Sequence, residues 1–327
     1  MISKERRKGD RLPTIDKTDY TNYKITFDQA LNIQMNRPTI ATDKYMNAPA
    51  YVSANYLNVS GYRGKAKSNV NVRAGEGTNH HIFGQLNQGR TVTIVSKGIY
   101  WHEIKYDAWR EATREDVKEY LDPSNNSKFQ HIRLDSSVDV SAKELNNVLK
   151  GKGILKKQGK AFNEASKKHG INEAYLIAHA LLETGNGSST LAKGVKVGKN
   201  KSGKLVRVTS SNRKILSNIK TIYNMFGIGA VDSNPLNGGA ITAYENGWFT
   251  PAAAIIGGAK WIGNDFIYNA HKQNTLYKMR WNPRMNEGYA YKQYATDIAW
   301  AVKQTIMIEN IYNQLNNPTL HFDIPKY

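Results

Sequence analysis

Apolar and polar residues alternate with the period of a helix over most of the chain after Trp109. Capping residues and glycines divide this stretch into segments, because Ser, Thr, Asp and Asn favour helix starts and glycine favours helix ends. A β-hairpin is predicted at residues 195–208, where the glycine-containing polar run 198–203 lies between two short apolar segments. The expected helices cover residues 113–120, 141–149, 159–169, 172–183, 251–263 and 294–315.

Residues 58–108 follow a different pattern, in which short segments with a period of two are separated by glycine turns. Residues 70–73, 91–95 and 100–106 are such segments, and the turn 74–77 follows the first of them. Short alternating strands joined by glycine turns are typical of a small β-barrel.

The first 57 residues are mainly polar, with scattered apolar positions and a predicted short helix at 25–35 that has Asp28 near its start. The three patterns predict three parts of the chain. They are an N-terminal arm or linker at 1–57, a small β domain at 58–108 and a mainly helical domain at 109–327.

Glu183 stands at an unusual place in the pattern, because it ends the apolar segment 174–182 and is followed at once by the helix-stopping segment 184–187. A carboxyl group there lies at the negative end of a helix dipole and beside apolar side chains. Both effects disfavour the charged form and raise the pKa. A carboxylic acid that stays protonated near neutral pH is what a glycosidase needs to protonate a leaving sugar oxygen.

Five blocks of sequence carry a family resemblance: His179–Val195, Tyr223–Ile228, Gly257–Gly263, Asn274–Pro283 and Gln293–Asp297. In this order they resemble the bacterial cell-wall glucosaminidases of glycoside hydrolase family 73. The likeness extends to the endo-β-N-acetylglucosaminidase domains of staphylococcal and bacillar autolysins and of phage tail hydrolases. The resemblance implies cleavage of the peptidoglycan glycan strand after N-acetylglucosamine.

The resemblance also implies a fold. We expect an α+β protein, with a mainly helical lysozyme-like catalytic domain that carries a β-hairpin lobe. Segments 71–77, 84–95 and 101–106 resemble a bacterial SH3 domain, so the preceding β domain is expected to be SH3-like. Such a domain binds the wall or serves only as a spacer, and the sequence leaves both interpretations open.

The second catalytic group is less evident, because Thr184–Val231 contains no Asp or Glu but nine Lys and Arg. Three hypotheses follow: a distant acid such as Asp232 activates water, a tyrosine orients the reacting centre, or the 2-acetamido group of the substrate acts as nucleophile. We favour the third, assisted by Tyr294, which matches the family's active-site tyrosine. The acids that follow the gap are Asp232, Glu245, Asp265, Glu287 and Asp297.

Other residues near these blocks have a structural alternative beside the functional one. His179 lies on the same helix face as Glu183, and packing is favoured over metal binding because no second ligand has the right spacing. Trp261, at helical spacing, is expected in the core. Polar and aromatic side chains that contact sugars elsewhere give the predicted substrate-binding set, although the polar ones are equally good turn formers. This set is Asn186, Ser188, Asn224, Phe226, Tyr277, Arg280 and Trp281.

Composition limits the classes of binding partner that can be expected. With 46 Lys and Arg against 27 Asp and Glu, the formal net charge is +19, which favours polyanions. The absence of nucleic-acid motifs leaves anionic teichoic acid as the better candidate beside peptidoglycan. There are no cysteines, so disulfides, thiol nucleophiles and Cys-ligated zinc are excluded. No metal, cofactor, membrane span or nucleic-acid partner is expected.

The charged first ten residues lack a following apolar segment, so no signal peptide is predicted. The expected location is extracellular, in the cell wall, or in a phage virion with tail proteins as further partners. The leading hypothesis is a peptidoglycan hydrolase. The alternative is a catalytically inactive wall-binding or virion structural protein, which has no need of the acid at position 183.

Overall fold

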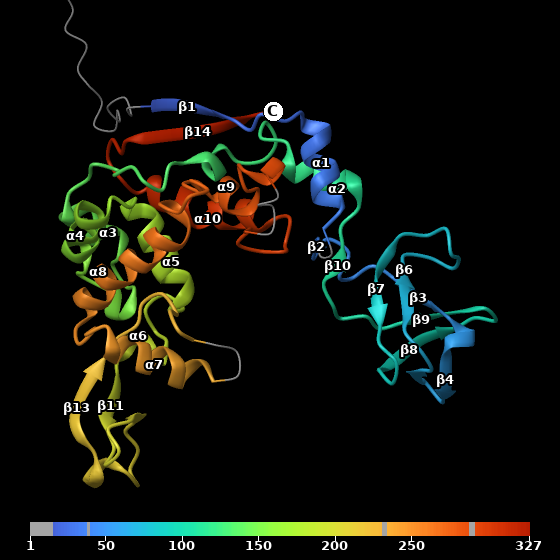
Figure 1. The fold of residues 1–327 in the computed structure, drawn as a ribbon, viewed down its shortest axis with the longest axis horizontal. Coiled ribbons are helices and arrows are strands. Elements are labelled where there is room, and N and C mark those ends of the chain that lie inside the picture. The colour runs from blue at the N-terminus through green and yellow to red at the C-terminus, as the bar shows by residue number, and fades with distance from the viewer. Residues whose placement is uncertain (1–15, 38–39, 231–233, 288–291) are drawn as a thin grey trace, which may run out of the picture. The chain divides into compact units, whose positions relative to one another are not determined.

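The computed structural model describes residues 16–37, 40–230, 234–287 and 292–327. It contains both helices and strands, as the sequence predicts, and it divides into two compact units (Figure 1). Unit 1 comprises Met1–Thr21, Ser127–Met279 and Gln304–Pro325, and unit 2 comprises Asn22–Asn126, Arg280–Lys303 and Lys326–Tyr327.

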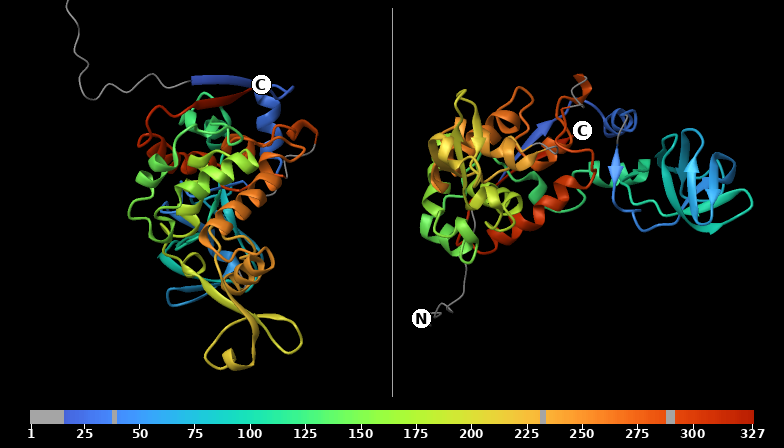
Figure 2. Two further views of the ribbon diagram at one scale, coloured as in Figure 1. Left: turned by 90° about the vertical axis from the view of Figure 1, so that its left-hand side faces the viewer. Right: turned by 90° about the horizontal axis from the view of Figure 1, so that it is seen from below.

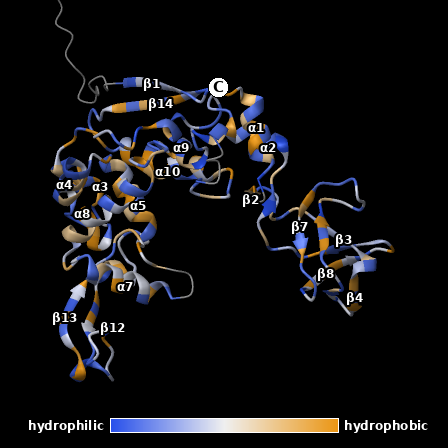
Figure 3. Cartoon of the chain, in the orientation of Figure 1, coloured by the Kyte–Doolittle hydropathy of each residue, from blue (hydrophilic) through white to orange (hydrophobic). Residues whose placement is uncertain are grey.

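Unit 1 is mainly helical, and helix α4 packs against α3, α5 and α8. Helix α5 begins where the sequence predicts, because the Asn172 side chain accepts a hydrogen bond from the backbone N–H of Tyr175 at 3.0 Å. It is largely hydrophobic (Figure 3) and forms the centre of this unit's core. Its helices are α3 (Ala142–Val148), α4 (Gly159–His169), α5 (Glu173–Glu183), α6 (Thr190–Lys193), α7 (Pro235–Glu245) and α8 (Pro251–Ile262). Most of α9 (Leu276–Arg280) and α10 (Trp300–Tyr312) also belongs to unit 1, whereas Arg280 and the first four residues of α10 belong to unit 2.

The predicted hairpin is confirmed as part of a three-stranded antiparallel sheet of order β12–β11–β13, which extends away from the helices of unit 1 (Figure 2, left). Its strands are β11 (Val195–Lys199), β12 (Leu205–Arg207) and β13 (Ser217–Ile222). A second, two-stranded sheet pairs β1 (Asp16–Asn22) with β14 (Leu320–Lys326). A π-helical segment at Gly263–Ile267 follows α8 directly.

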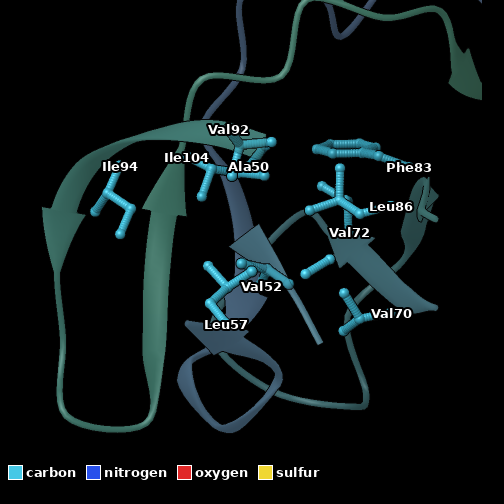
Figure 4. Packing of buried hydrophobic residues seen from close by; sticks show 11 residues of the cluster. Ala50, Val52, Leu57, Val70, Val72, Phe83, Leu86, Val92, Ile94 and Ile104 are labelled. Carbon is cyan, nitrogen blue, oxygen red and sulfur yellow. The ribbon is translucent and has the colours of Figure 1, made fainter. Parts of the chain in front are cut away.

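Unit 2 contains an open seven-stranded sheet of order β4–β5–β8–β9–β3–β6–β7. Eleven buried residues form its core, among them Val52, Val72, Phe83 and Ile94 (Figure 4). The strands are β3 (Ala50–Ser53), β4 (Leu57–Ser60), β5 (Arg63–Ala66), β6 (Val70–Arg73), β7 (Ile82–Leu86), β8 (Thr91–Lys97) and β9 (Trp101–Ile104). Strands β6, β8 and β9 fall where the alternating pattern predicts them, whereas β3 lies within residues 1–57, which were expected to be an arm or linker. The end strands β4 and β7 do not pair, so the sheet is not a closed barrel.

Two helices and a short strand pair complete unit 2. Both helices begin at a predicted position, and each has a capping box, with Thr26 at the start of α1 and Thr113 at the start of α2. The elements are α1 (Phe27–Met35), α2 (Arg114–Leu121), β2 (Ala41–Thr42) and β10 (Arg110–Glu111). Short 3₁₀ turns lie at Ala54–Tyr56, Lys128–His131, Gly153–Leu155, Arg213–Ile215 and Met285–Glu287.

The last helix is shorter than predicted, since α10 covers Trp300–Tyr312 rather than 294–315. The Asp297 side chain accepts the backbone N–H of Ala299 at 3.0 Å, a local turn that competes with helix. Arg280 binds the backbone carbonyls of Thr296 and Asp297, at 3.3 and 2.8 Å, and so holds this segment outside the helix.

Candidate active site

Glu183 is the last residue of α5, and its side chain is 37% exposed. Burial of the remainder raises the pKa of its carboxyl group. This is the direction that the sequence predicts, and desolvation is the cause. The side chain is therefore both accessible to a substrate and biased toward the protonated form.

A tight turn ends α5 just after Glu183. Its backbone is left-handed at Gly185, Asn186 and Gly187, with φ values of 53°, 59° and 80°. The Thr184 hydroxyl accepts the backbone N–H of Gly187 at 2.8 Å. Because the turn is closed by its own hydrogen bonds, the position of the acid at the helix end is fixed.

Asn186 and Ser188 take part in this turn. The amide oxygen of Asn186 accepts a hydrogen bond from Lys152 Nζ at 3.0 Å, and the Ser188 hydroxyl donates to the Gly185 carbonyl at 2.6 Å. Both side chains therefore help to form the turn, as the structural alternative predicted. They are also exposed, so a substrate can still reach them. Their contact with a sugar stays a prediction.

The loop that follows β13 lies against the acid. A Cβ atom on Gly227 would stand 2.8 Å from Glu183 Oε2, and the φ of Gly227 is 67°. Asn224 closes this loop, because its amide nitrogen donates to the carbonyls of Ile228 and Gly239, and its oxygen accepts the backbone N–H of Phe226. The predicted substrate-binding Asn224 is buried and shapes the loop beside Glu183.

His179 lies one turn before Glu183, with its Nε2 3.7 Å from Glu183 Oε1. Its ring packs edge-on against Phe226, with centroids 5.6 Å apart and planes at 90°. Burial lowers the pKa of His179 to about 4, so the imidazole is neutral near pH 7. A neutral neighbour does not stabilise the Glu183 carboxylate by charge, which agrees with the raised pKa of the acid.

Two adjacent glycines of α8 accept the aromatic side chains of this region. A Cβ on Gly258 would lie 2.3 Å from the Phe226 ring, and one on Gly257 would lie 2.1 Å from Trp248 Nε1. The absence of side chains therefore lets both rings sit directly on the helix. Phe226 is buried and forms part of the support for His179 and the loop.

The structure describes four of the five candidate partner acids. Asp232 lies outside the described residues. Glu245 is exposed at the end of α7, and the Asp297 carboxylate binds Lys303 Nζ at 2.8 Å. In the part of the chain that the structure describes, no hydrogen bond joins another carboxyl group to Glu183.

Tyr294 belongs to unit 2, is 40% exposed and stacks on Trp300, with ring centroids 4.3 Å apart. Arg280 organises the segment that carries it. The Arg280 guanidinium donates to Gln293 Oε1 at 2.8 Å and to the carbonyls of Thr296 and Asp297. Arg280 is buried, and these hydrogen bonds hold the segment that carries Tyr294.

The other predicted aromatic contacts differ in exposure. Tyr277 and Trp281 are fully buried, with Tyr277 packed on His131 and Trp281 under the Arg280 guanidinium. A sugar would reach them only after rearrangement, so these contacts stay predictions. The expectation for Trp261 was wrong, because this residue is 49% exposed rather than in the core.

Sequence patterns did not indicate two features of the site. One is the approach of Gly227 to the acid, for which the only signal is a glycine within a family block. The other is the role of Arg280 in holding residues 293–297. Within the described ranges, no cluster of three or more His, Asp or Glu could hold a metal, and no helix is long and apolar enough to cross a membrane.

Comparisons with known proteins identify the family of the chain. Residues 159–313 match the model of the glucosaminidase family, described as mannosyl-glycoprotein endo-beta-N-acetylglucosaminidase. A beta-N-acetylglucosaminidase of Bacillus subtilis strain 168 is 45% identical over 254 residues, which make up 76% of this chain and 26% of that protein. The chain belongs to the glucosaminidase family, which confirms the resemblance inferred from the sequence.

Solved structures extend the comparison to the fold. The crystal structure of a major bifunctional autolysin has a TM-score of 0.60 and 31% identity, over 97% of this chain and 100% of that one. A structure of Staphylococcus aureus autolysin E in complex with a muropeptide has a TM-score of 0.50 and 29% identity, over 93% and 98% of the two chains. The chain spans about a quarter of the length of the Bacillus subtilis relative.

Proposed function

We propose that the chain is an endo-β-N-acetylglucosaminidase that hydrolyses the glycan strand of peptidoglycan after N-acetylglucosamine. The observation that carries the proposal is Glu183, a partly exposed carboxyl group with a raised pKa at the end of α5. Family membership supports the reaction class. The muropeptide bound in the related autolysin E supports peptidoglycan as the substrate.

In the proposed reaction, Glu183 donates its proton to the glycosidic oxygen as the bond from that oxygen to the anomeric carbon breaks. The carbonyl oxygen of the substrate's own 2-acetamido group attacks the anomeric carbon and forms a cyclic intermediate. Water then opens this ring and returns a proton to Glu183. The proposed reaction therefore needs one acidic group on the protein and no cofactor.

Substrate assistance is supported by the acid-free segment from Thr184 to Val231, which includes the whole three-stranded sheet. The Asp297 carboxylate is engaged with Lys303, which makes it a poor candidate for a general base. We assign Tyr294 the task of orienting the acetamido group, and Arg280 the task of holding the segment that carries Tyr294.

We propose a lysozyme-like arrangement for residues 109–327 and an SH3-like, wall-binding character for residues 58–108, with residues 1–57 before them. Strand β3 of this first part also belongs to the sheet of unit 2. The open sheet of unit 2 supports a binding role, because Tyr56, Asn71, Arg73 and Trp101 line a 330 Å³ pocket on it. Arg73→Ala combined with Trp101→Ala, which alters the lining of this pocket, is expected to weaken wall pull-down and to leave hydrolysis of soluble fragments nearly intact. Unchanged pull-down would make the region a spacer.

Anionic teichoic acid is the proposed second partner in the wall. The three-stranded sheet of unit 1 and its flanks present exposed cations without any acid in the same segment. Wall binding is then expected to fall with salt, since exposed charges are screened beyond about 10 Å at 0.1 M. These cations are Lys193, Lys196, Lys199, Lys201, Lys204, Arg213, Lys214 and Lys220.

The proposed location is extracellular, at the wall of a host cell or on a phage tail. Activity on bacterial walls in a zymogram, followed by analysis of the released ends, tests the function. New reducing ends on N-acetylglucosamine are expected, and reducing ends on N-acetylmuramic acid would assign the other bond. De-N-acetylated glycan lacks the internal nucleophile, so it is expected to resist cleavage even where it binds.

A further inference from the structure

A pocket of about 720 Å³ opens on unit 1 where the end of α8 faces the connection between α7 and α8. Its size is within the usual range for small-molecule sites. Glu183 does not line it. The lining side chains are Asn246, Trp248, Lys260, Trp261, Asn264 and Asp265.

Trp261 gives the pocket an aromatic surface. It is 49% exposed, although large apolar side chains of a stable helix are normally buried. Its indole Nε1 donates a long hydrogen bond of 3.4 Å to the side-chain oxygen of Asn246. An edge contact of this kind restrains the ring and leaves its face available. Trp248 is buried beside it, over Gly257.

The polar side of the pocket is formed by an irregular segment. Directly after Trp261 the helix widens into the π-helical turn Gly263–Ile267, in which the backbone N–H of Tyr268 binds the carbonyl of Gly263 at 2.8 Å. Asn264 and Asp265 lie in this turn and line the pocket. Such π-helical turns are rare in proteins as a whole, but those that occur are often found at functional sites.

We propose that this pocket binds an N-acetylated sugar unit of the glycan strand, as an accessory site separate from Glu183. The inference rests on the proposed function for the identity of the glycan. A sugar ring has an apolar face that suits an exposed indole, and a rim of hydroxyl and amide groups that suits the amides of Asn246 and Asn264 and the Asp265 carboxylate.

The charges of the pocket favour a neutral ligand. Lys260 and Asp265 line it together, so it has one basic and one acidic side chain. A polyanion would meet the Asp265 carboxylate, whereas the cationic surface of the three-stranded sheet carries no acid. A neutral sugar meets no such repulsion and can hydrogen-bond with both groups.

The pocket is joined to the acid through α8. Gly257 lines the pocket beside Trp248, and the next residue, Gly258, lies against Phe226, which packs on His179. Because Glu183 does not line the pocket, sugar binding there contributes to holding the strand and not to bond cleavage. The expected kinetic effect is on KM and not on kcat.

The test measures binding of oligomers of β-1,4-linked N-acetylglucosamine to the full chain by calorimetry, in a Glu183→Gln background that prevents cleavage. Trp261→Ala is expected to weaken binding about fivefold to tenfold, and Trp261→Phe, which keeps a ring, about half as much on a logarithmic scale. Trp109→Ala is the matched control, because Trp109 is also 49% exposed but lies in unit 2. It is expected to leave binding unchanged.

In the otherwise unaltered enzyme, Trp261→Ala is expected to raise KM on wall glycan by a similar factor and to leave kcat unchanged. Equal affinity and equal KM in Trp261→Ala and the parent would overturn the accessory site and leave the proposed hydrolysis intact. A sugar-free stem peptide whose binding depends on Trp261 would overturn the sugar assignment. A wild-type chain that binds the oligomer through Trp261 but cleaves no wall would overturn the proposed function alone.

Discussion

Helix α5 carries a glutamate at each end, and the two carboxyl groups have opposite surroundings. Glu173, in the first turn, is buried and accepts hydrogen bonds from the Ser137 hydroxyl at 2.8 Å and the Val138 backbone N–H at 2.9 Å. Glu183, at the last position, is partly exposed and has the neutral His179 side chain 3.7 Å away.

The difference shows how one residue type meets two environments on one element. At the N-terminus two donors bind the Glu173 side chain, so Glu173 fastens the preceding loop to the helix. At the C-terminus the dipole opposes a negative charge, and within the described ranges no donor compensates for desolvation, so Glu183 is biased toward the acid form. The chemical role follows from the end of the helix and from the supply of donors.

The largest expected effect separates the two glutamates by activity. Glu183→Gln keeps the shape of the side chain but cannot donate an acidic proton, so wall hydrolysis is expected to fall about 10²–10⁴-fold. Glu173→Gln is expected to retain the turnover of the parent well below its melting temperature. Turbidity loss of purified walls measures both, and residual lysis above about a tenth in Glu183→Gln would remove the assignment of the acid.

A second, smaller effect tests the surroundings of the acid. Gly227→Ala places a methyl group 2.8 Å from the original position of Glu183 Oε2 and adds backbone strain at φ 67°. Displacement of the carboxyl group is expected to lower turnover about tenfold to a hundredfold. Gly203→Ala is the matched control, because it has φ 77° with open space around its Cβ. Similar kinetics in both variants would mean that strain alone is responsible.

The third prediction concerns stability. Here Glu173→Gln is expected to have the larger effect and Glu183→Gln the smaller one. Glu173→Gln replaces one of two accepting oxygens by an amide nitrogen that cannot accept, and we expect the free energy of unfolding to fall by about 1–3 kcal/mol. Glu183→Gln is expected to leave it unchanged or to raise it near neutral pH. Urea denaturation followed by circular dichroism decides, and an equal loss in both variants would contradict the comparison.

The smallest expected effect is in the pH dependence. The folded-state pKa of Glu183 lies above its ordinary value of 4.5, so the native state binds more protons than the unfolded state between these two values. The stabilising contribution is present below pH 4.5 and is lost as the pH rises through the folded-state pKa. The stability of Glu183→Gln relative to the parent should therefore increase with pH above 4.5, and a constant difference would contradict the raised pKa.

Much of the frame around these glutamates could be predicted from the sequence. The cap at Asn172 and the stop after Glu183 are local signals, and the structure has α5 at those bounds. The same holds for α4 and for strands β6, β8 and β9 of unit 2. Local signals succeed where the residues that decide an element are within a few positions of one another.

The parts that sequence reasoning missed depend on distant contacts. The late start of α10 depends on Arg280, which lies 16 and 17 residues before the carbonyls that it binds. The exposure of Trp261 depends on which face of α8 meets its neighbours, and helical spacing alone does not give it. Aromatic side chains such as Tyr277 and Trp281 suit either a core or a sugar-binding surface, and only burial separates the two.

The pair Gly257–Gly258 has a practical consequence for protein engineering. The two positions are consecutive, yet an added methyl group would press on Trp248 at the first and on Phe226 at the second. A larger side chain at Gly257 would therefore disturb the accessory pocket, whereas one at Gly258 would disturb the residues that pack behind Glu183. Variant libraries restricted to this dipeptide offer independent control of strand retention and of bond cleavage.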